Sequence, residues 1–282
     1  MKKVCKIYAL YSGSGGNSVY IRVGDDAILI DAGKSARALC KALEKIGESI
    51  EGIKAIFITH EHTDHVSAIE TLSKKHNIPI HITKQSASRY DSCPDSPVHS
   101  CLCTHGVEFC VEVGEIKVTS FKTPHDSKMS VGYRIDFCDE GMAHAIGLAT
   151  DIGYVSDEVK KGLLGCEAVI IEANHDVDML MTGPYTYDLK LRVASNRGHL
   201  SNRDCSDFAC ALAESGTKAF MLAHLSKENN EPELAYDEVS RALCSYGATV
   251  CVADPDEPVE LCGCFGEDNA YDEREIYNPW NA

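Results

Sequence analysis

The stretch ITHEHTDHVSAI, residues 58–69, places three histidines and one aspartate within six positions, directly after an apolar run. His60 and His62 are one residue apart on an extended segment, so their side chains can point to the same side. Asp64 and His65 follow in the turn that opens the next predicted helix. Imidazole and carboxylate groups are ligands of zinc, iron and manganese. The stretch therefore predicts a metal site at the end of a buried strand, with a polar surface loop as the alternative.

Three later residues stand in the same kind of place, at the end of an apolar run. They are His125 in KTPHDS, Asp151 in LATDIG and His224 in MLAHLS. Ligands are expected on such loops, because a rigid scaffold positions them there. The four side chains of the first stretch cannot easily share one metal, so the pattern favours two metals with a bridging carboxylate. A buried, hydrogen-bonded histidine is the alternative for His125 and for His224.

The hydrophobic pattern predicts strands and helices along the whole chain. Strands are expected at 4–10, 17–23, 27–31 and 55–59, between 107 and 150, and at 168–172 and 219–223. Helices are expected at 35–46, 66–76, 202–215 and 233–246. This order predicts an α/β chain in which helices cover packed sheets. No low-complexity linker interrupts it, so we expect one domain over residues 1–282, with an acidic C-terminal extension from about residue 254.

The composition narrows the class of protein. The chain has 282 residues, of which 44% are hydrophobic, and this is enough for a sizeable core. Its net charge of −16 argues against a protein that coats nucleic acid, although an enzyme acting on one phosphodiester remains possible. We find no signal-peptide pattern and no run of 18 apolar residues. A cytoplasmic protein without a membrane partner is therefore expected.

Fourteen cysteines are present, and in a cytoplasmic protein they are expected to be reduced thiols. Most stand singly in periodic segments, where cysteine packs as a small hydrophobic residue. The loop that contains Cys93, His99, Cys101 and Cys103 either binds a further metal or carries free thiols. Its CLC spacing lacks the two-residue gap typical of a zinc knuckle, which favours free thiols.

Together, THEHTDH, the preceding LIDAG and the three later candidate ligands resemble the metallo-β-lactamase superfamily of hydrolases, over roughly residues 4–253. The resemblance implies an αββα four-layer sandwich with the site at one edge of both sheets. It also implies two divalent metal ions, Zn or Mn with Fe possible. By this resemblance, a first metal would be bound by His60, His62 and His125, and a second metal by Asp64, His65 and His224. Asp151 would bridge the two metals. Asp31 would support the histidine-rich loop by hydrogen bonds, with a plain turn residue as the alternative.

Two identities favour particular branches of that superfamily. Histidine at position 62, where the similar flavodiiron reductases have glutamate, favours hydrolysis. Aspartate rather than cysteine at position 151 resembles the phosphodiesterases and thioesterases more than the enzymes that cleave antibiotics.

The segments VIIEANHD (169–176) and RGHLS (197–201) resemble two linked motifs of tRNase Z-type nucleases. In those enzymes a glutamate at a strand end pairs with a histidine that opens a helix, and here the pair would be Glu172 and His199. A histidine held by a carboxylate can donate a proton to the departing oxygen of a phosphodiester. Asp64, Glu172 and His199 are therefore the candidate catalytic residues. The alternatives are a helix cap for His199 and an ordinary ion-pair partner for Glu172.

Two further features are weaker candidates for contact with a substrate phosphate. SGSGGNS (12–18), with Ser14 and Asn17, could offer backbone N–H groups to an anion, although a plain hairpin turn explains it better. The basic residues Arg197 and Arg203, with Lys190 and Arg192, flank His199. A solvated helix face explains these four residues almost equally well.

The segments YSGSGGNS, THEHTDH, TPHD, GHLSN and AHLSKENN are together similar to the YycJ/WalJ-type branch of the superfamily. This similarity implies a dinuclear phosphodiesterase that acts on nucleic acid, with single-stranded DNA exonuclease activity favoured. A glyoxalase II-like thioesterase or another small-molecule hydrolase is the first alternative, and a non-catalytic metal-binding partner protein is the second. The 73 residues from Asp151 to His224 leave no room for the β-CASP insertion of RNase J-type enzymes. The pattern leaves the oligomeric state open.

Overall fold

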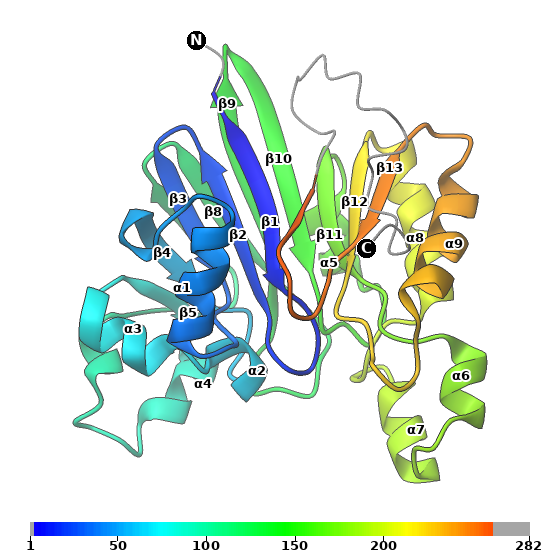
Figure 1. The fold of residues 1–282 in the computed structure, drawn as a ribbon, viewed down its shortest axis with the longest axis horizontal. Helices are drawn as coiled ribbons and strands as arrows, with labels where there is room; N and C mark the ends of the chain where they lie inside the picture. Colours follow the sequence, from blue (N-terminus) through cyan, green and yellow to red (C-terminus); the bar gives the residue numbers. More distant parts are fainter. Residues whose placement is uncertain (1–2, 262–282) are drawn as a thin grey trace.

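The computed structural model describes residues 3–261 and contains two seven-stranded sheets (Figure 1). The first sheet has the strand order β14-β1-β2-β3-β4-β5-β6, and its parallel part runs from β3 to β6. Its strands are β1 (Cys5–Tyr11), β2 (Ser18–Val23), β3 (Asp26–Ile30), β4 (Ile53–Phe57), β5 (Ile80–Thr83), β6 (Leu102–His105) and β14 (Val259–Glu260). Because β14 pairs antiparallel with β1, the described part of the predicted C-terminal extension contributes a strand to this sheet. The rest of that extension lies outside the described residues.

The second sheet has the order β13-β12-β11-β10-β9-β8-β7. The strands β10 to β13 are parallel, and β7 to β10 are antiparallel. Its strands are β7 (Cys110–Val113), β8 (Ile116–Lys122), β9 (Val131–Asp139), β10 (Met142–Ala149), β11 (Ala168–Glu172), β12 (Ala219–Ala223) and β13 (Thr249–Val252). The predicted strands at 168–172 and 219–223 are confirmed with the same bounds.

Helices cover the outer face of each sheet. Apolar side chains of α1 and α3 pack on the first sheet, and those of α5, α8 and α9 pack on the second. The helices are α1 (Ala36–Lys45), α2 (Thr63–Val66), α3 (Ile69–His76), α4 (Lys84–Ala87), α5 (Asp157–Leu163), α6 (Val177–Thr182), α7 (Tyr187–Val193), α8 (Asn202–Glu214) and α9 (Pro232–Leu243). Short 3-10 turns, η1 to η3, lie at Ile50–Gly52, Ser88–Tyr90 and Pro97–Ser100. No helix in residues 3–261 has the length and apolar character needed to cross a lipid bilayer.

The inner faces of the two sheets form one core. Phe57 on β4 packs edge-on against Tyr133 on β9, with ring centroids 5.8 Å apart. The Tyr133 hydroxyl donates a hydrogen bond of 2.6 Å to the carbonyl of Ile58. Both sheets are thereby joined two residues before His60, so the predicted αββα four-layer sandwich is confirmed and its core fixes the base of the histidine-rich loop.

The predicted helix at 66–76 is wrong in one respect, because two helices occupy that region. Ser67 and Ala68, between α2 and α3, keep right-handed helical backbone angles, but the helical hydrogen-bond pattern is interrupted there by Ala32. Its N–H donates to the carbonyl of His65 (2.8 Å), and its carbonyl accepts from the N–H of Ala68 (2.9 Å). These long-range bonds replace intrahelical ones and fix α2 against the loop that follows β3.

A histidine pair in the first sheet, of which His81 is buried, gives a testable pH dependence. His81 Nδ1 lies 2.9 Å from His105 Nε2, and the His81 ring stacks on Phe57. Burial, with a contribution from His105, lowers the pKa of His81 to about 4. The unfolded chain binds this proton near pH 6.5, so it holds more protons than the folded chain below that pH. We therefore expect the free energy of unfolding to fall as the pH drops from about 6.5 towards 4.

Urea unfolding at pH 7 and at pH 4.5 measures this effect. The variant His81→Phe should lose part of the difference between the two pH values, whereas His99→Asn, at an exposed position, should retain all of it. An unchanged difference in His81→Phe would contradict the assignment.

Candidate metal centre

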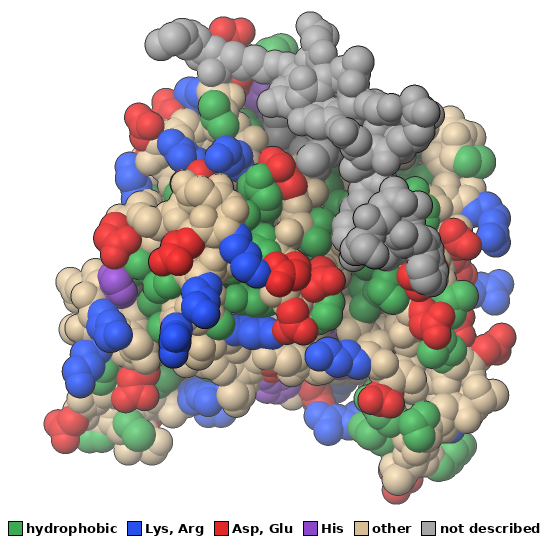
Figure 2. Space-filling model, in the orientation of Figure 1, with side chains coloured by type: hydrophobic (Ala, Val, Ile, Leu, Met, Phe, Trp, Pro, Cys, Tyr) green, Lys and Arg blue, Asp and Glu red, His purple; other side chains and the backbone are tan. Residues whose placement is uncertain are grey.

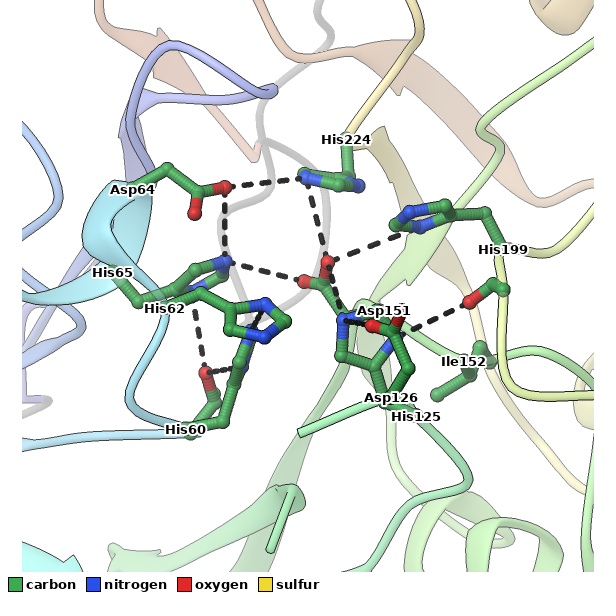
Figure 3. Close-up of polar contacts among 12 residues, drawn as sticks. His60, His62, Asp64, His65, His125, Asp126, Asp151, Ile152, His199 and His224 are labelled. Carbon is green, nitrogen blue, oxygen red and sulfur yellow. Dashed lines mark hydrogen bonds and ion pairs between the residues drawn. The ribbon is translucent and has the colours of Figure 1, made fainter. Parts of the chain in front are cut away.

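The candidate ligands converge where strands of both sheets end (Figure 3). His60, His125, Asp151 and His224 lie one to three residues beyond the ends of β4, β8, β10 and β12. The short helix α2 supplies Asp64 and His65. The sites predicted from separate parts of the sequence are thus brought to one edge of the sandwich, because each strand ends at the same side of the core.

Three of the strand ends share an unusual backbone conformation. Asp31, Asp151 and His224 have φ values of 62°, 56° and 58°, in the left-handed region that side chains other than glycine rarely adopt. Each turns the chain sharply at the end of a strand. Hydrogen bonds hold two of these turns, from the Asp31 N–H to the Phe57 carbonyl (2.8 Å) and from the His224 N–H to Ser12 Oγ (2.7 Å). Strained backbone that is held in this way is typical of functional sites.

The first group of side chains consists of His60, His62 and His125. Their rings lie 4.5 to 5.2 Å apart between centroids. His60 Nε2 and His62 Nδ1 approach to 3.0 Å, so the two residues do point to the same side as predicted. One nitrogen of each ring lies within 4.8 Å of the others, which is close enough for the three to share one ion.

The second group consists of Asp64, His65 and His224, with Asp151 beside it. Asp64 Oδ2 lies 3.4 Å from His65 Nε2 and 3.9 Å from His224 Nε2. Asp151 reaches His65 Nε2 through Oδ2 at 3.4 Å and His224 Nε2 through Oδ1 at 3.5 Å. Its Oδ1 is also 3.8 Å from His125 Nε2, so the Asp151 carboxylate lies between the two groups.

Four of the five histidines use the Nδ1 atom away from the cluster. His60 Nδ1 lies 3.0 Å from Thr59 Oγ1, and His65 Nδ1 lies 2.7 Å from Asp31 Oδ2. His125 Nδ1 donates to the Gly198 carbonyl (3.2 Å), and His224 Nδ1 lies 2.9 Å from Glu172 Oε1. These contacts fix each ring and turn its Nε2 inward, which is the usual arrangement around histidines that bind metal.

The cluster fits a cation better than it fits the protein alone. Asp151 Oδ2 and His224 Nε2 are buried, and within the described part of the chain neither makes a hydrogen bond. Polar atoms in such positions are costly unless something binds them. A divalent ion bound by imidazole and carboxylate would satisfy both atoms.

The charge state of the cluster supports the same conclusion. Burial lowers the pKa of His60 and of His125, so both are neutral, as metal ligands must be. Burial opposes the charge on His224, but Asp151 and the other carboxylates outweigh it and raise its pKa to about 10. Although burial opposes ionisation of Asp151, the surrounding histidines hold its pKa well below the usual range. The cluster is therefore rich in negative charge that attracts cations, and metal binding there would release protons.

Asp31 makes hydrogen bonds to the histidine-rich loop. Its Oδ1 accepts the Thr59 N–H and its Oδ2 accepts the Thr59 hydroxyl, both at 2.8 Å, in addition to the contact with His65. The carboxylate thereby joins the end of β3 to the loop that follows β4.

Removing this support should weaken metal binding. We expect Asp31→Ala to lower the affinity for Zn²⁺ by about 10- to 100-fold, because outer carboxylates orient the rings that bind the ion. Competition with a chromophoric chelator measures the affinity. Asp26→Ala is the matched control, since Asp26 is a buried carboxylate at the opposite end of the same strand. Equal affinities in both variants would show that Asp31 has no part in the site.

Glu172 and His199 are in contact. His199 Nδ1 lies 2.7 Å from Glu172 Oε1, the oxygen that also meets His224. Glu172 Oε2 accepts the N–H groups of Ile152 (2.7 Å) and Leu200 (3.2 Å). Burial opposes ionisation, but His199 and His224 lower the pKa of Glu172 to about 2. The helix that follows begins with Ser201 as its cap, so His199 is not needed as a cap.

The four candidates for contact with a substrate phosphate lie in different surroundings. The Asn17 amide lies 3.3 Å from Asp64 Oδ2 and 3.2 Å from His65 Nε2, so it faces the metal cluster itself. Gly13, Gly16 and Asn17 use their N–H groups inside the protein, which agrees with a turn. Ser14 is exposed. Arg197 and Arg203 are also exposed, and Arg197 Nη2 is 3.5 Å from the His125 carbonyl.

Two residues that sequence reasoning did not assign support the site. Glu61 accepts the Lys128 N–H and the Ser86 hydroxyl, both at 2.7 Å, and so links the loop of His60 to the loop of His125. Asp126 binds Arg192 on α7 through two hydrogen bonds of 2.9 and 2.5 Å. Their positions inside HEH and PHD mark them as neighbours of candidate ligands, but no sequence pattern indicates the contacts that they make.

The cysteine loop is separate from this centre. Cys101 Sγ approaches Asn77 Oδ1 (3.3 Å), and His99 Nε2 lies 3.0 Å from the Cys93 carbonyl. Among residues 3–261, the groups of side chains close enough to share a metal all belong to the cluster described above. The alternative of a further metal in this loop therefore finds no support among the described residues, where Cys93, Cys101 and Cys103 are free cysteines.

Comparison with known proteins agrees with this geometry. A family model described as a beta-lactamase superfamily domain matches residues 26–225. The chain belongs to this superfamily. The superfamily domain, the relatives described next and the cluster of histidines and carboxylates together make it a metal-dependent hydrolase.

Within the superfamily, the chain is 32% identical over 258 residues to the exodeoxyribonuclease YycJ of Bacillus anthracis, covering 89% of this chain and 96% of that protein. It is 34% identical over 269 residues to the exodeoxyribonuclease WalJ of Streptococcus pneumoniae serotype 2, covering 91% and 97%. The fold is shared with Zn²⁺-bound PqqB from Methylobacterium extorquens, at a TM-score of 0.63 and 18% identity over 90% and 99% of the two chains.

Proposed function

We propose that this superfamily member hydrolyses phosphodiester bonds of nucleic acid with two divalent metal ions, and that its substrate is single-stranded DNA degraded from an end. One observation carries the proposal, namely the contact between Glu172 and His199 beside the ligand cluster. A thioester needs no such pair, because a thiolate leaves without help from an acid. The names of YycJ and WalJ, both exodeoxyribonucleases, support the choice of DNA.

In this proposal each of the two groups of side chains described above binds one metal ion. His60, His62 and His125 would hold one ion, and Asp64, His65 and His224 would hold the other. Asp151, which lies between the two groups, would contact both. When bound, the ions supply Lewis acidity that activates water and neutralises charge on the phosphoryl oxygens. Zinc is supported by the ligand chemistry and by the zinc in PqqB, and manganese suits the same histidines and carboxylates.

The protein's own groups then handle the protons. The N–H groups of Ile152 and Leu200 fix Glu172, and Glu172 holds His199 through Nδ1. This leaves His199 Nε2 to donate a proton to the departing oxygen. Among the cluster carboxylates, Asp64 is the most exposed, with 25% of its side chain accessible, against 3% for Asp151 and 0% for Glu172. Asp64 is therefore our candidate to accept the proton of the attacking water.

Hydrolysis assays test this function directly. Protein loaded with Mn²⁺ or with Zn²⁺ is given bis(p-nitrophenyl) phosphate and, separately, 5′-labelled single-stranded DNA, duplex DNA and RNA of one sequence. We expect cleavage of the phosphate diester and stepwise shortening of the single-stranded DNA. The variant His65→Ala should cleave neither, because it lacks a ligand. Elemental analysis of the wild type should give two metal ions per chain.

Other outcomes would correct the proposal in defined ways. If two metals bind but no phosphodiester is cleaved, the nuclease function is wrong, and thioesters become the substrates to test. Faster cleavage of RNA than of DNA would correct the substrate. One metal per chain with full activity would correct the number of ions.

A further inference from the structure

The helices α6 and α7 contribute very little to the core. Leu180 is the single buried residue of α6, and α7 has none. Large apolar side chains on both helices face solvent instead: Val177 is 45% exposed, Met181 51%, Tyr187 68% and Leu191 50%. Figure 2 shows hydrophobic side chains gathered over α6 and α7 at the lower right. Apolar groups that support no core and remain exposed together are typical of a binding surface.

This exposed surface borders the candidate metal centre. Arg192 near the end of α7 binds Asp126, the neighbour of His125. The carbonyl of Val193, the last residue of α7, accepts the N–H of His199 at 2.9 Å. The helix therefore leads directly to the side chain that would face the leaving group. A polymer cut beside His199 can therefore continue along this helix.

The charge of the segment is opposite to that of the whole chain. Residues 186–203 contain four basic residues and one acidic residue, whereas the full chain has a net charge of −16. Arg197 is exposed, and its guanidinium lies 3.5 Å from the His125 carbonyl. Local positive charge beside the site complements the phosphates of a nucleic acid.

The exposed side chains of α7 have the chemistry to bind unpaired bases. Tyr187 and Leu191 are four residues apart and so lie on the same face of the helix. Stacking on an aromatic ring is available to every base, provided that the base is not already paired in a duplex. A tyrosine with an apolar neighbour and nearby arginines is therefore suited to a single strand, with bases on α7 and phosphates towards Arg197.

We propose that Tyr187 and Leu191 form a base-stacking surface that holds a single-stranded nucleic acid as it leaves the metal centre. The proposal rests on the proposed nuclease function and specifies how that function would distinguish a single strand from a duplex. It explains why two helices that bury almost nothing are attached to the active-site loops.

Fluorescence anisotropy with two labelled ligands tests the proposal. One is a single-stranded oligodeoxynucleotide, and the other is an abasic strand of the same length, which has the phosphates but no bases. Binding is measured in a His199→Ala background so that neither ligand is degraded. Tyr187→Ala and Leu191→Ala are compared with Tyr246→Ala. Tyr246 is 40% exposed and precedes β13, which runs parallel to β12, so it lies at the far end of the sheet from His224.

We expect Tyr187→Ala to weaken binding of the oligonucleotide by about 5- to 100-fold, the effect of losing one stacked base. Leu191→Ala should act in the same direction. Affinity for the abasic strand should stay the same, and Tyr246→Ala should change neither affinity. With His199 intact, Tyr187→Ala should bind as many metal ions as the wild type and unfold at the same temperature, which shows that the fold and the metal centre are preserved.

An equal loss for both strands, or no loss for either, would overturn the proposal. Light scattering that shows a wild-type dimer and a monomeric Tyr187→Ala would overturn it too, by assigning the surface to a second copy of the chain. Failure of the proposed function gives a different result. In that case the wild type hydrolyses no phosphodiester, whether or not base-dependent binding is present.

Discussion

Replacing His199 by alanine is expected to lower the turnover of single-stranded DNA by about 10²- to 10⁴-fold while the metal content stays at the wild-type level. The reason is that His199 and the candidate metal ligands occupy different parts of the site. His199 meets Glu172 through Nδ1, and 23% of its side chain is exposed, whereas His65 and His224 are almost fully buried among the carboxylates. Loss of the side chain should therefore remove the proton donor and leave the ligand groups in place.

The metal content of His199→Ala distinguishes a proton donor from a metal ligand at this position. Asp151, Glu172, His199 and His224 are close enough together to hold an ion themselves, so His199 could instead be a ligand. Loss of a metal from His199→Ala, measured by elemental analysis, would establish that role and reject the acid. His144→Ala is the matched control, because His144 pairs with Glu167 in the same way (3.0 Å) at the opposite end of β10. Its turnover should equal that of the wild type.

A single methyl group at position 33 is expected to be more disruptive than the loss of a large side chain. A Cβ on Gly33 would lie 1.6 Å from the Asp64 carbonyl oxygen and 2.5 Å from the Asn17 nitrogen. These two atoms form a hydrogen bond with each other, from the Asn17 N–H to the Asp64 carbonyl (2.8 Å), and the Gly33 N–H donates to the Asn17 carbonyl (2.8 Å), so the two bonds join three loops. Gly33→Ala must displace α2 and with it the candidate ligands Asp64 and His65.

The expected cost is at least about 3 kcal/mol of unfolding free energy, at the upper end of the range for overpacking. Thermal or urea unfolding measures the stability, and metal analysis of any folded protein should show lost binding. Gly15→Ala is the control, since a Cβ there meets nothing within 4 Å and the residue lies in the same loop as Asn17. It should change the stability by no more than about 0.5 kcal/mol. Wild-type stability and metal content in Gly33→Ala would contradict the packing argument.

Much of the fold could be predicted from local pattern. The strands at 168–172 and 219–223 are short apolar runs buried on both faces, so their bounds are clear in the sequence. The helix at 35–46 was also recognisable, because Ser35 caps it and apolar residues recur at helical spacing. The break between α2 and α3 could not be recognised in the sequence, because it depends on hydrogen bonds to Ala32, which lies more than thirty residues away in the chain. Tertiary contacts override local propensity there.

In the candidate site, too, the residues with a recognisable motif could be predicted, and the contacts between distant loops could not. Residues that are recognisable by chemistry and motif, such as His60 and Asp151, come together as the resemblance implied, although their roles in binding metal stay predictions. The supporting contacts of Glu61, Asn17 and Asp126 could not be predicted, because each joins loops that are far apart in the chain. No periodicity or spacing carries that information. It exists only once both sheets have packed and brought the loops to one edge.

The left-handed backbone at Asp31, Asp151 and His224 makes this protein a poor subject for stabilisation by unguided mutation. Each such conformation costs about 1–2 kcal/mol for a residue with a side chain, and glycine would relieve it. Glycine at Asp151 or His224 would relieve this strain only by removing a candidate metal ligand, and glycine at Asp31 would also remove the hydrogen bonds to Thr59 and His65. At the proposed metal centre the strained backbone carries candidate ligands, so thermostability and turnover have to be selected together.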